Sequence, residues 1–130
     1  MKKTLKVVAG IIENENQEVL CALRSHNMSI PNHWEFPGGK VEANESLFDA
    51  IEREIKEELQ CIVQAQSVFH ENIHEYNNFI INLICIKCKL IDKTPQASEH
   101  AKLIWIHKQY LTSLKWAPAD IPAVNKLINE

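Results

Sequence analysis

Three glutamates, Glu54, Glu57 and Glu58, occupy one flank of a segment whose residue pattern predicts a helix. Spacings of three and four residues place their carboxylates about one helical turn apart, where like charges repel by a few tenths of a kcal/mol per pair. A solvated acidic face is the simplest interpretation of such a pattern. Mg²⁺, however, binds carboxylates together with water and phosphate oxygens. The three glutamates therefore predict a site for one or two divalent cations that act on a phosphate compound.

The predicted helix begins at Ser46 and extends to Leu59. Serine followed three residues later by an acid, here Asp49, is typical of a helix start, and the segment contains neither Gly nor Pro. One side of the helix is apolar and is expected to face the core; it carries Phe48, Ile51, Ile55 and Leu59. Arg53 is predicted on a different flank, where it would pair with a carboxylate such as Glu45 and hold the preceding loop against the helix.

The rest of the chain has the pattern of strands around two helices. Residues 5–12 and 18–23 are apolar runs on either side of a polar turn, and they predict a hairpin. Residues 34–36 predict a short extended segment that ends at Gly38 and Gly39, where glycine permits backbone conformations that other residues resist. Further elements are strands predicted at residues 61–69, 79–90 and 103–106, and a second helix from Asp120 to about residue 129.

The length and composition indicate one globular domain spanning residues 1–130. Hydrophobic residues make up 45% of the chain and charged residues 24%, which argues against disorder. The formal net charge is -3, so the chain lacks the basic surface that binding to a nucleic acid polymer requires. An acidic protein that handles a phosphate needs a local positive charge, which a divalent cation supplies.

The apolar run at residues 7–12 is too short to span a membrane and is flanked by Lys6 and Glu13, so it predicts a strand and not a targeting segment. The expected location is cytoplasmic, without attachment to a membrane. In that reducing compartment the four cysteines are expected to be thiols that pack in the core. They are Cys21, Cys61, Cys85 and Cys88. Trp105 and Trp116 are likewise interpreted as packing residues and not as a stacking platform.

Two short motifs suggest metal sites of other kinds, and both are rejected on geometry. His70 and His74 fit the H-E-x-x-H pattern of zinc peptidases, but their surroundings predict a strand, in which positions i and i+4 lie about 13 Å apart. Cys85 and Cys88 form a C-x-x-C pair, but this spacing sends two side chains of a strand to opposite faces. Neither pair is expected to hold zinc.

The residues around the glutamates also match a known signature, the Nudix box G-x5-E-x7-R-E-U-x-E-E-x-G-U, in which U is a bulky aliphatic residue. The matching residues are Gly39, Glu45, Arg53, Glu54, Ile55, Glu57 and Glu58. Two positions depart: Gln60 replaces a glycine that would cap the helix in a left-handed turn, and Cys61 replaces an aliphatic residue. The chain thus resembles the Nudix hydrolase superfamily over nearly its whole length. The resemblance implies an α/β structure, the Nudix fold, which is an α/β/α sandwich with a central mixed β-sheet.

The resemblance also implies how the site is built. Mg²⁺, or Mn²⁺ in its place, would be bound by Glu54, Glu57, Glu58 and the carbonyl oxygen of Gly39. The residues that would support the box structurally are Gly39, Glu45, Arg53 and Ile55. Lys40 would contact phosphate as a point charge. The residues assigned to catalysis are Arg53, Glu57 and Glu99. Glu99, in the loop at residues 96–100, is expected to be the general base or a further metal ligand, and Glu57 is the alternative for the base.

Beyond the box, residues 34–42 resemble the MutT-like branch of the superfamily, and residues 116–122 are similar to the tail of bacterial CTP pyrophosphohydrolases. Asp120 stands where MutT proteins that hydrolyse 8-oxo-dGTP carry a base-reading asparagine. An ionised aspartate only accepts hydrogen bonds, so an amino-bearing edge such as that of cytosine would suit it, whereas protonation would weaken this preference. Arg24 and Phe79 are further pocket candidates, for hydrogen bonding to the base and stacking on it.

The implied function is that of a Mg²⁺-dependent enzyme that cleaves a nucleoside triphosphate to the monophosphate and pyrophosphate, as in sanitation of the nucleotide pool. Its substrate would be a small nucleotide, and it would act as a monomer or a homodimer. The enzymatic alternatives are an 8-oxo-dGTP diphosphatase and a diphosphatase of dinucleotides or nucleotide sugars. A Nudix-fold module that binds a nucleotide without turnover is a further alternative, against which the intact glutamates argue.

Overall fold

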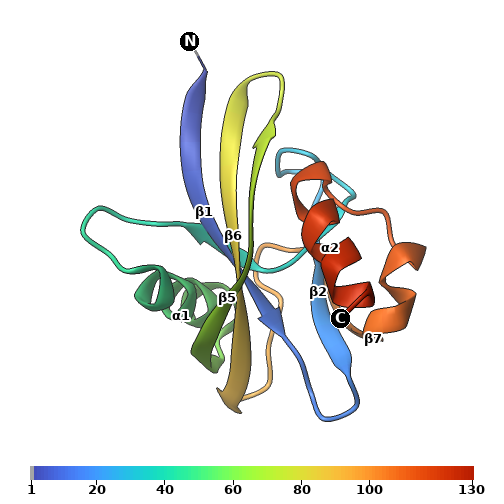
Figure 1. The fold of residues 1–130 in the computed structure, drawn as a ribbon. Helices are drawn as coiled ribbons and strands as arrows, with labels where there is room; N and C mark the ends of the chain where they lie inside the picture. Colours follow the sequence, from blue (N-terminus) through green and yellow to red (C-terminus); the bar gives the residue numbers. More distant parts are fainter. Residues whose placement is uncertain (1) are drawn as a thin grey trace.

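The computed structural model describes residues 2–130, and its strands form two sheets (Figure 1). The strands are β1 (Lys3–Ile12), β2 (Glu18–Leu23), β3 (Trp34–Glu35), β4 (Gly38–Lys40), β5 (Ile62–Glu75), β6 (Phe79–Asp92) and β7 (Lys102–His107). The helices are α1 (Leu47–Leu59) and α2 (Ile121–Ile128), with two short 3-10 helices, η1 (Lys108–Ser113) and η2 (Pro118–Asp120). Both α-helices begin and end within one residue of their predicted bounds.

The larger sheet is mixed and has the strand order β4-β1-β6-β5. β1 runs parallel to β6 along its whole length and antiparallel to β4, so both of its edges are paired. The second sheet, with the order β3-β2-β7, is antiparallel. The predicted hairpin is therefore wrong, because β1 and β2 lie in different sheets and are joined by an isolated bridge between Glu13 and Val19. The sequence located both strands but not their partners, since every residue from Val8 to Ile12 is buried and shows no alternation.

α1 and α2 lie on opposite sides of the larger sheet (Figure 1). The buried cluster under α1 includes Val8, Ile12, Ile51, Ile55, Leu59, Ile84 and Ile86. The cluster on the α2 side includes Ala9, Ile11, Leu83, Cys85, Trp116, Val124 and Leu127. Trp105 packs against the first cluster and Trp116 belongs to the second, so both are packing residues as predicted. Side chains of β1 and β6 alternate between the two clusters, which confirms the α/β/α sandwich around a mixed sheet.

The buried face of α1 lies closer to the acidic flank than the face that the apolar pattern predicts. Ile51 and Ile55 are fully buried, but Phe48, which was predicted on the same side, is 37% exposed. Ala50 is buried instead, and it lies one helical turn before Glu54. This orientation brings part of the acidic flank against the sheet.

Gly38 and Gly39 in β4 are required for space and not for an unusual backbone conformation. No glycine among the described residues has a positive φ, so the predicted reason for these glycines is wrong. A Cβ at Gly38 would overlap the backbone of Val8 in the neighbouring strand β1. A Cβ at Gly39 would overlap the carboxylate of Glu54 in α1. Close approach of the strand and of the helix therefore demands glycine at these positions.

The H-E-x-x-H segment lies within β5, which extends beyond its predicted end to Glu75. His70 and His74 are thus on an extended strand, as expected, and cannot share one zinc ion. Cys85 and Cys88 lie in β6 and pack in the clusters on opposite faces of the sheet, also as expected. All four cysteines of the chain are free and buried.

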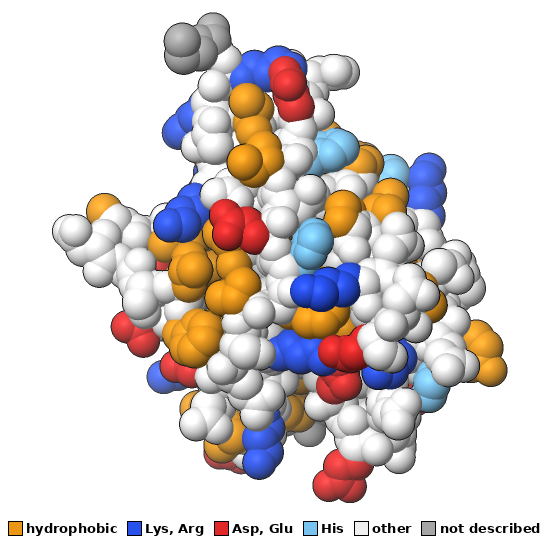
Figure 2. Space-filling view, viewed as in Figure 1, with side chains coloured by type: hydrophobic (Ala, Val, Ile, Leu, Met, Phe, Trp, Pro, Cys, Tyr) orange, Lys and Arg blue, Asp and Glu red, His pale blue; other side chains and the backbone are white. Residues whose placement is uncertain are grey.

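Charged side chains of both signs are mixed over the face drawn in Figure 2. In that view of residues 2–130, Lys and Arg lie near Asp and Glu and form no continuous basic stripe. A polymeric phosphate backbone would meet both signs of charge on this face. Within the same residues, neither α-helix has the length and apolar character needed to cross a membrane.

Gln60 ends α1 in the left-handed conformation that glycine adopts without strain. Its φ is 56° and its ψ is 33°, and its N–H donates to the carbonyl of Lys56 at 3.1 Å. Replacing Gln60 by Gly should raise the free energy of unfolding by about 0.5 kcal/mol, because relief of the strain outweighs the added freedom of the unfolded chain. Denaturant unfolding followed by circular dichroism measures the change.

Lys56→Gly is the matched control, since Lys56 is an exposed helical residue in the last turn of the same helix. Glycine there should lower the free energy of unfolding by about 1 kcal/mol. A loss of similar size in the Gln60→Gly variant would contradict the assignment of strain to Gln60.

Candidate active site

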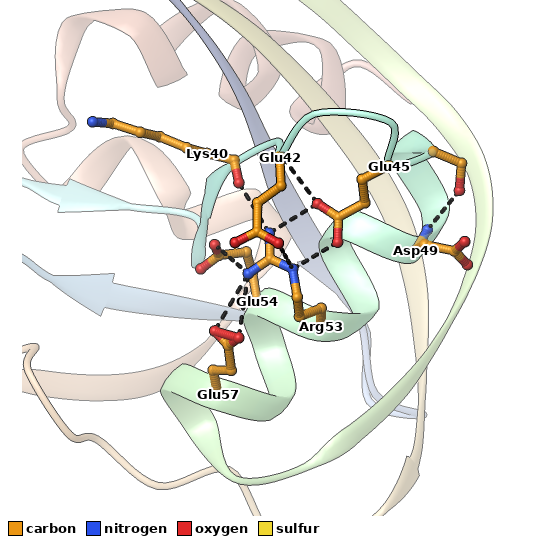
Figure 3. Close-up of polar contacts among 8 residues, drawn as sticks. Lys40, Glu42, Glu45, Asp49, Arg53, Glu54 and Glu57 are labelled. Atoms are coloured by element: carbon orange, nitrogen blue, oxygen red, sulfur yellow. Dashed lines mark hydrogen bonds and ion pairs between the residues drawn. The ribbon is translucent and has the colours of Figure 1, made fainter.

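Arg53 lies among the carboxylates of α1 and of the loop that precedes it (Figure 3). Its guanidinium donates to both oxygens of Glu45, at 2.6 and 2.9 Å, which confirms the predicted pair. It also donates to Glu54 at 2.9 Å and to Glu57 at 3.3 Å, so the prediction that it points to a separate flank is wrong. The hydrogen bonds from Arg53 lower the pKa of Glu45 to about 2. This arginine therefore offsets the repulsion among the surrounding carboxylates.

The carboxylate of Glu54 is held against the backbone of β4. The overlap that a Cβ at Gly39 would make with this carboxylate shows that the two groups are in direct contact. Gly39 is itself fixed by its pairing with Val8 in β1. Two of the residues predicted to bind the cation, Gly39 and Glu54, are thus brought together by the packing of α1 on the sheet.

Glu58 lines a cavity and is less exposed than Glu57. Burial raises the pKa of Glu58 to about 7, with the charge of His100 lowering it and that of Glu54 raising it. Its Oε2 atom is buried and has no hydrogen-bond partner within the described part of the chain. A buried carboxylate oxygen without a partner is unfavourable, so this atom is suited to a cation or to a donor on a ligand.

The three glutamates do not converge on a single point. Among residues 2–130, no group of three His, Cys, Asp or Glu side chains is arranged to hold a metal ion. Glu54 and Glu57 both bind Arg53, whereas Glu58 lines the adjacent cavity. Helical spacing fixes where the three side chains begin but not their rotamers, so the sequence predicted their proximity and not their orientation.

The cavity has a volume of about 360 Å³ and collects the residues predicted to bind substrate. Those residues are Arg24, Lys40, Phe79 and Asp120, and all four line it together with Gly39 and Glu58. Much of the remaining wall is apolar and comes from β1 and β6, through Leu5, Val7, Ile81 and Leu83. A largely apolar cavity with a few polar groups is typical of a site for a small molecule.

Asp120 is buried in the wall of this cavity. Its Oδ2 accepts the backbone N–H of Phe36 at 3.0 Å, and burial raises its pKa well above the usual range. The preceding residue, Ala119, donates its N–H to the hydroxyl of Tyr76 and accepts at its carbonyl from Asn72, both at 3.0 Å. Side chains of β5 and its turn therefore fix the backbone that presents Asp120.

Glu35, which lines the cavity, and His100 form a second polar group that the sequence did not predict. Glu35 accepts from Arg24 at 2.7 Å, and its other oxygen bonds to Nε2 of His100 at 2.8 Å. Arg24 also donates to the hydroxyl of Ser29 at 3.0 Å. Glu35 belongs to the segment that resembles MutT proteins and His100 directly follows Glu99, but only the tertiary structure pairs them.

Glu99 and Lys40 are exposed. In Figure 3 the side chain of Lys40 points away from the carboxylates, although the residue lines the cavity. Glu99 lies in the loop after β6, where its neighbour Ser98 donates to the backbone carbonyl of Glu58 at 2.7 Å. The charge of Glu99 contributes to the raised pKa of Glu58. The loop nominated for the general base therefore lies beside the end of α1.

Comparison with known proteins agrees with this arrangement. The NUDIX domain family matches residues 3–126. The CTP pyrophosphohydrolase of Escherichia coli (strain K12) is 36% identical over 120 residues, which cover 92% of this chain and 88% of that protein. The 8-oxo-dGTP diphosphatase of the same strain is 31% identical over 125 residues, covering 96% and 97%. Among solved structures, the chain is similar to the solution structure of the DNA mismatch repair protein MutT, a Nudix hydrolase of methicillin resistant Staphylococcus aureus 252. The two sequences are 46% identical, the match covers 99% of this chain and 98% of that one, and the TM-score is 0.80.

The chain therefore belongs to the NUDIX family. It is a Nudix hydrolase, an enzyme that hydrolyses phosphoric anhydride bonds. Hydrolases of this family use a divalent cation. The residues present fit such a cation, because carboxylate and carbonyl oxygens are the ligands of hard divalent ions. The unpaired oxygen of Glu58 and the contact of Glu54 with the backbone of Gly39 place these donors at one edge of the cavity.

Gly39→Ala should weaken binding of a divalent cation while leaving the fold intact. The added Cβ would displace the carboxylate of Glu54, and displacement of a group at a metal site typically costs roughly 10- to 100-fold in affinity. Titration with Mn²⁺, followed by water proton relaxation, measures the affinity without a nucleotide.

Gly10→Ala is the control for this substitution. A Cβ at Gly10 would lie 3.5 Å from the side chain of Ile51, which is an ordinary contact, so Mn²⁺ affinity should stay at the level of the unsubstituted protein. Equal Mn²⁺ affinities in both alanine variants would exclude the predicted contribution of the Gly39 and Glu54 pair.

Proposed function

We propose that this protein is a Mg²⁺-dependent nucleoside triphosphate pyrophosphohydrolase, which cleaves its substrate to the nucleoside monophosphate and pyrophosphate. The proposal rests on one cavity that is lined both by Asp120 and by Gly39 and Glu58 of the Nudix box. A nucleotide whose base lay against Asp120 would direct its phosphates toward the carboxylates of α1. The names of the relatives described above support a triphosphate as the substrate.

The residues that would hold Mg²⁺ are Glu54, Glu57, Glu58 and the carbonyl oxygen of Gly39. Mn²⁺ would substitute, since it also accepts carboxylate, carbonyl and water oxygens. When bound, the cation neutralises phosphate charge and polarises the phosphoryl group for attack by water. Arg53 holds the carboxylates of Glu54 and Glu57, and Glu45 in turn holds Arg53 through two hydrogen bonds. This arrangement keeps part of the acidic set in place in the free enzyme.

Glu99 is the proposed general base, which takes the proton of the attacking water at a carboxylate oxygen. The hydrogen bond from Ser98 to the carbonyl of Glu58 supports this assignment, because it holds the loop beside the carboxylates. Glu57, which is exposed on α1, is the alternative base. Lys40, at the wall of the cavity, is proposed to bind a phosphate group.

Asp120 is proposed to select the base. As an ionised group it would accept from an amino-bearing edge, which favours cytosine. Burial raises its pKa, and a protonated Asp120 would offer one donor and one acceptor, as asparagine does. This second state favours 8-oxo-dGTP as the other candidate substrate, in line with the name of the second curated relative.

The proposal also includes the compartment and the assembly. Four buried free thiols support a reducing compartment such as the cytoplasm. The proposed assembly is a monomer or a homodimer.

Glu57→Gln should reduce turnover by several orders of magnitude, because a neutral amide is a poor ligand for a hard dication. Its side chain is 58% exposed, so the fold should be unchanged. The measurement is release of pyrophosphate from CTP, dCTP and 8-oxo-dGTP, with and without Mg²⁺, together with ADP-ribose hydrolysis.

Asp49→Asn is the control, since it removes an exposed carboxylate from the same helix, and it should leave turnover unchanged. Near-normal turnover by Glu57→Gln would refute the ligand assignment. Hydrolysis of ADP-ribose by the unsubstituted enzyme without turnover of any triphosphate would refute the proposed substrate class.

Asp120→Asn should shift the choice of base toward 8-oxo-dGTP. Relative to an ionised Asp120, the amide adds a donor and removes an acceptor, so kcat/KM for CTP relative to 8-oxo-dGTP should fall roughly 10- to 100-fold. An unchanged ratio, with neither kcat/KM value lowered, would show that Asp120 is protonated when it reads the base. Both values are obtained from pyrophosphate release at a single pH. A parallel fall for both substrates would show that Asp120 supports the cavity without reading the base.

A further inference from the structure

His100 is a buried polar side chain that the proposed reaction does not use. Its side chain is only 3% exposed, although it lies in the loop between β6 and β7. Its Nε2 atom bonds to Oε2 of Glu35 at 2.8 Å. A carboxylate accepts hydrogen bonds, so the imidazole is the donor and its Nε2 carries the proton.

The loop that carries His100 is fastened to the body of the protein at both ends. The N–H of Gln96 donates to the carbonyl of Leu59 at 2.8 Å, and the N–H of Ala101 donates to the carbonyl of Leu23 at 2.9 Å. Between these points, Ser98 donates to the carbonyl of Glu58 at 2.7 Å. Glu99 is exposed and stands between Ser98 and His100, so a side-chain contact of each neighbour holds the backbone from which Glu99 projects.

The contact of His100 also leads into the cavity. Glu35, which receives the hydrogen bond from His100, receives a second one from Arg24 at 2.7 Å. Both Glu35 and Arg24 line the cavity, whereas His100 is behind them. A chain of hydrogen bonds thus connects the cavity wall with the residue that directly follows Glu99.

We infer that His100 is a positioning residue for Glu99, which it holds at the carboxylates of α1 by anchoring the loop to Glu35. The inference rests on the proposed function, in which Glu99 is the general base. Because His100 bonds to Glu35, the position of the loop depends on a side chain that lines the cavity proposed to hold the nucleotide. His100 itself touches neither the substrate nor the reacting atoms.

Hydrogen exchange tests the structural part of the inference without any nucleotide. His100→Ala should speed exchange of the amides of Gln96 and Ala101 roughly tenfold or more, because loss of the anchor lets the loop open locally. Amides in the centre of β1 and β6 should exchange at unchanged rates. His107→Ala is the matched control, since His107 caps η1 by accepting from Gln109 and lies outside the loop.

Steady-state kinetics test the functional part. His100→Ala should lower kcat roughly 10- to 100-fold with a smaller change in KM, because it displaces a catalytic group while Arg24 still holds Glu35 at the cavity wall. His100→Gln places an amide donor near the position of Nε2 and should recover most of the lost kcat. A change confined to KM, or no recovery in His100→Gln, would overturn the inference.

A double-mutant cycle with Glu99→Gln separates positioning from general support of the fold. If His100 acts through Glu99, then His100→Ala should have little further effect on kcat in the Glu99→Gln background. Additive losses, or full activity of Glu99→Gln itself, would overturn the inference. Absence of Mg²⁺-dependent triphosphate hydrolysis by the unsubstituted enzyme would instead contradict the proposed function. Unchanged hydrogen exchange at Gln96 and Ala101 in the His100→Ala variant would contradict the anchoring of the loop by His100.

Discussion

The contact between α1 and β4 is the constraint on which the site depends. The carboxylate of Glu54 can reach the backbone of Gly39 only if the helix lies close to the sheet, and a Cβ at Gly39 would prevent this. In the same packing of α1 on the sheet, Phe48 is 37% exposed and Glu58 is buried enough for its pKa to rise. The contact of α1 with β4 therefore accounts for the glycine, and the orientation of the helix is consistent with an exposed aromatic ring and a carboxyl group with a raised pKa.

The concentration of negative charge on α1 is relieved in two different ways. Glu45, Glu54 and Glu57 share the guanidinium of Arg53, whose hydrogen bonds lower the pKa of Glu45. Glu58 lacks this partner, and burial together with the neighbouring charge of Glu54 raises its pKa instead. Glu45 and Glu58 thus differ in how readily they ionise, although their side chains are chemically identical.

Local spacing explains what the sequence could predict. The Nudix box, the bounds of α1 and the pair of Arg53 with Glu45 all depend on residues within one short segment, where helical geometry fixes relative positions. The candidate pocket residues, Asp120 among them, came from resemblance to a family and were found in one cavity. The strand partners of β1 could not be predicted, because a strand buried on both faces gives no periodic signal that identifies its neighbours.

Contacts between distant parts of the chain explain what could not be predicted. His100 and Glu35 are 65 residues apart, and Asn72 and Ala119 are 47 residues apart. Each of these side chains is an ordinary polar residue in the sequence, and only folding gives it a partner. Rotamers are also set by the whole structure, so the orientation of the glutamates toward Arg53 was not accessible from their spacing.

The two ends of the cavity differ in how they are held. At the end near Asp120, the backbone N–H of Phe36 and the fastened peptide of Ala119 fix the position of the carboxyl group. At the other end Lys40 is exposed, and Glu57, which is also exposed, belongs to α1 and does not line the cavity. In the proposed function, a rigid wall suits discrimination between bases, because a group that cannot move penalises a poor match. Exposed carboxylates suit the proposed phosphate end, since their arrangement would change between binding Arg53 and binding a cation with a polyphosphate.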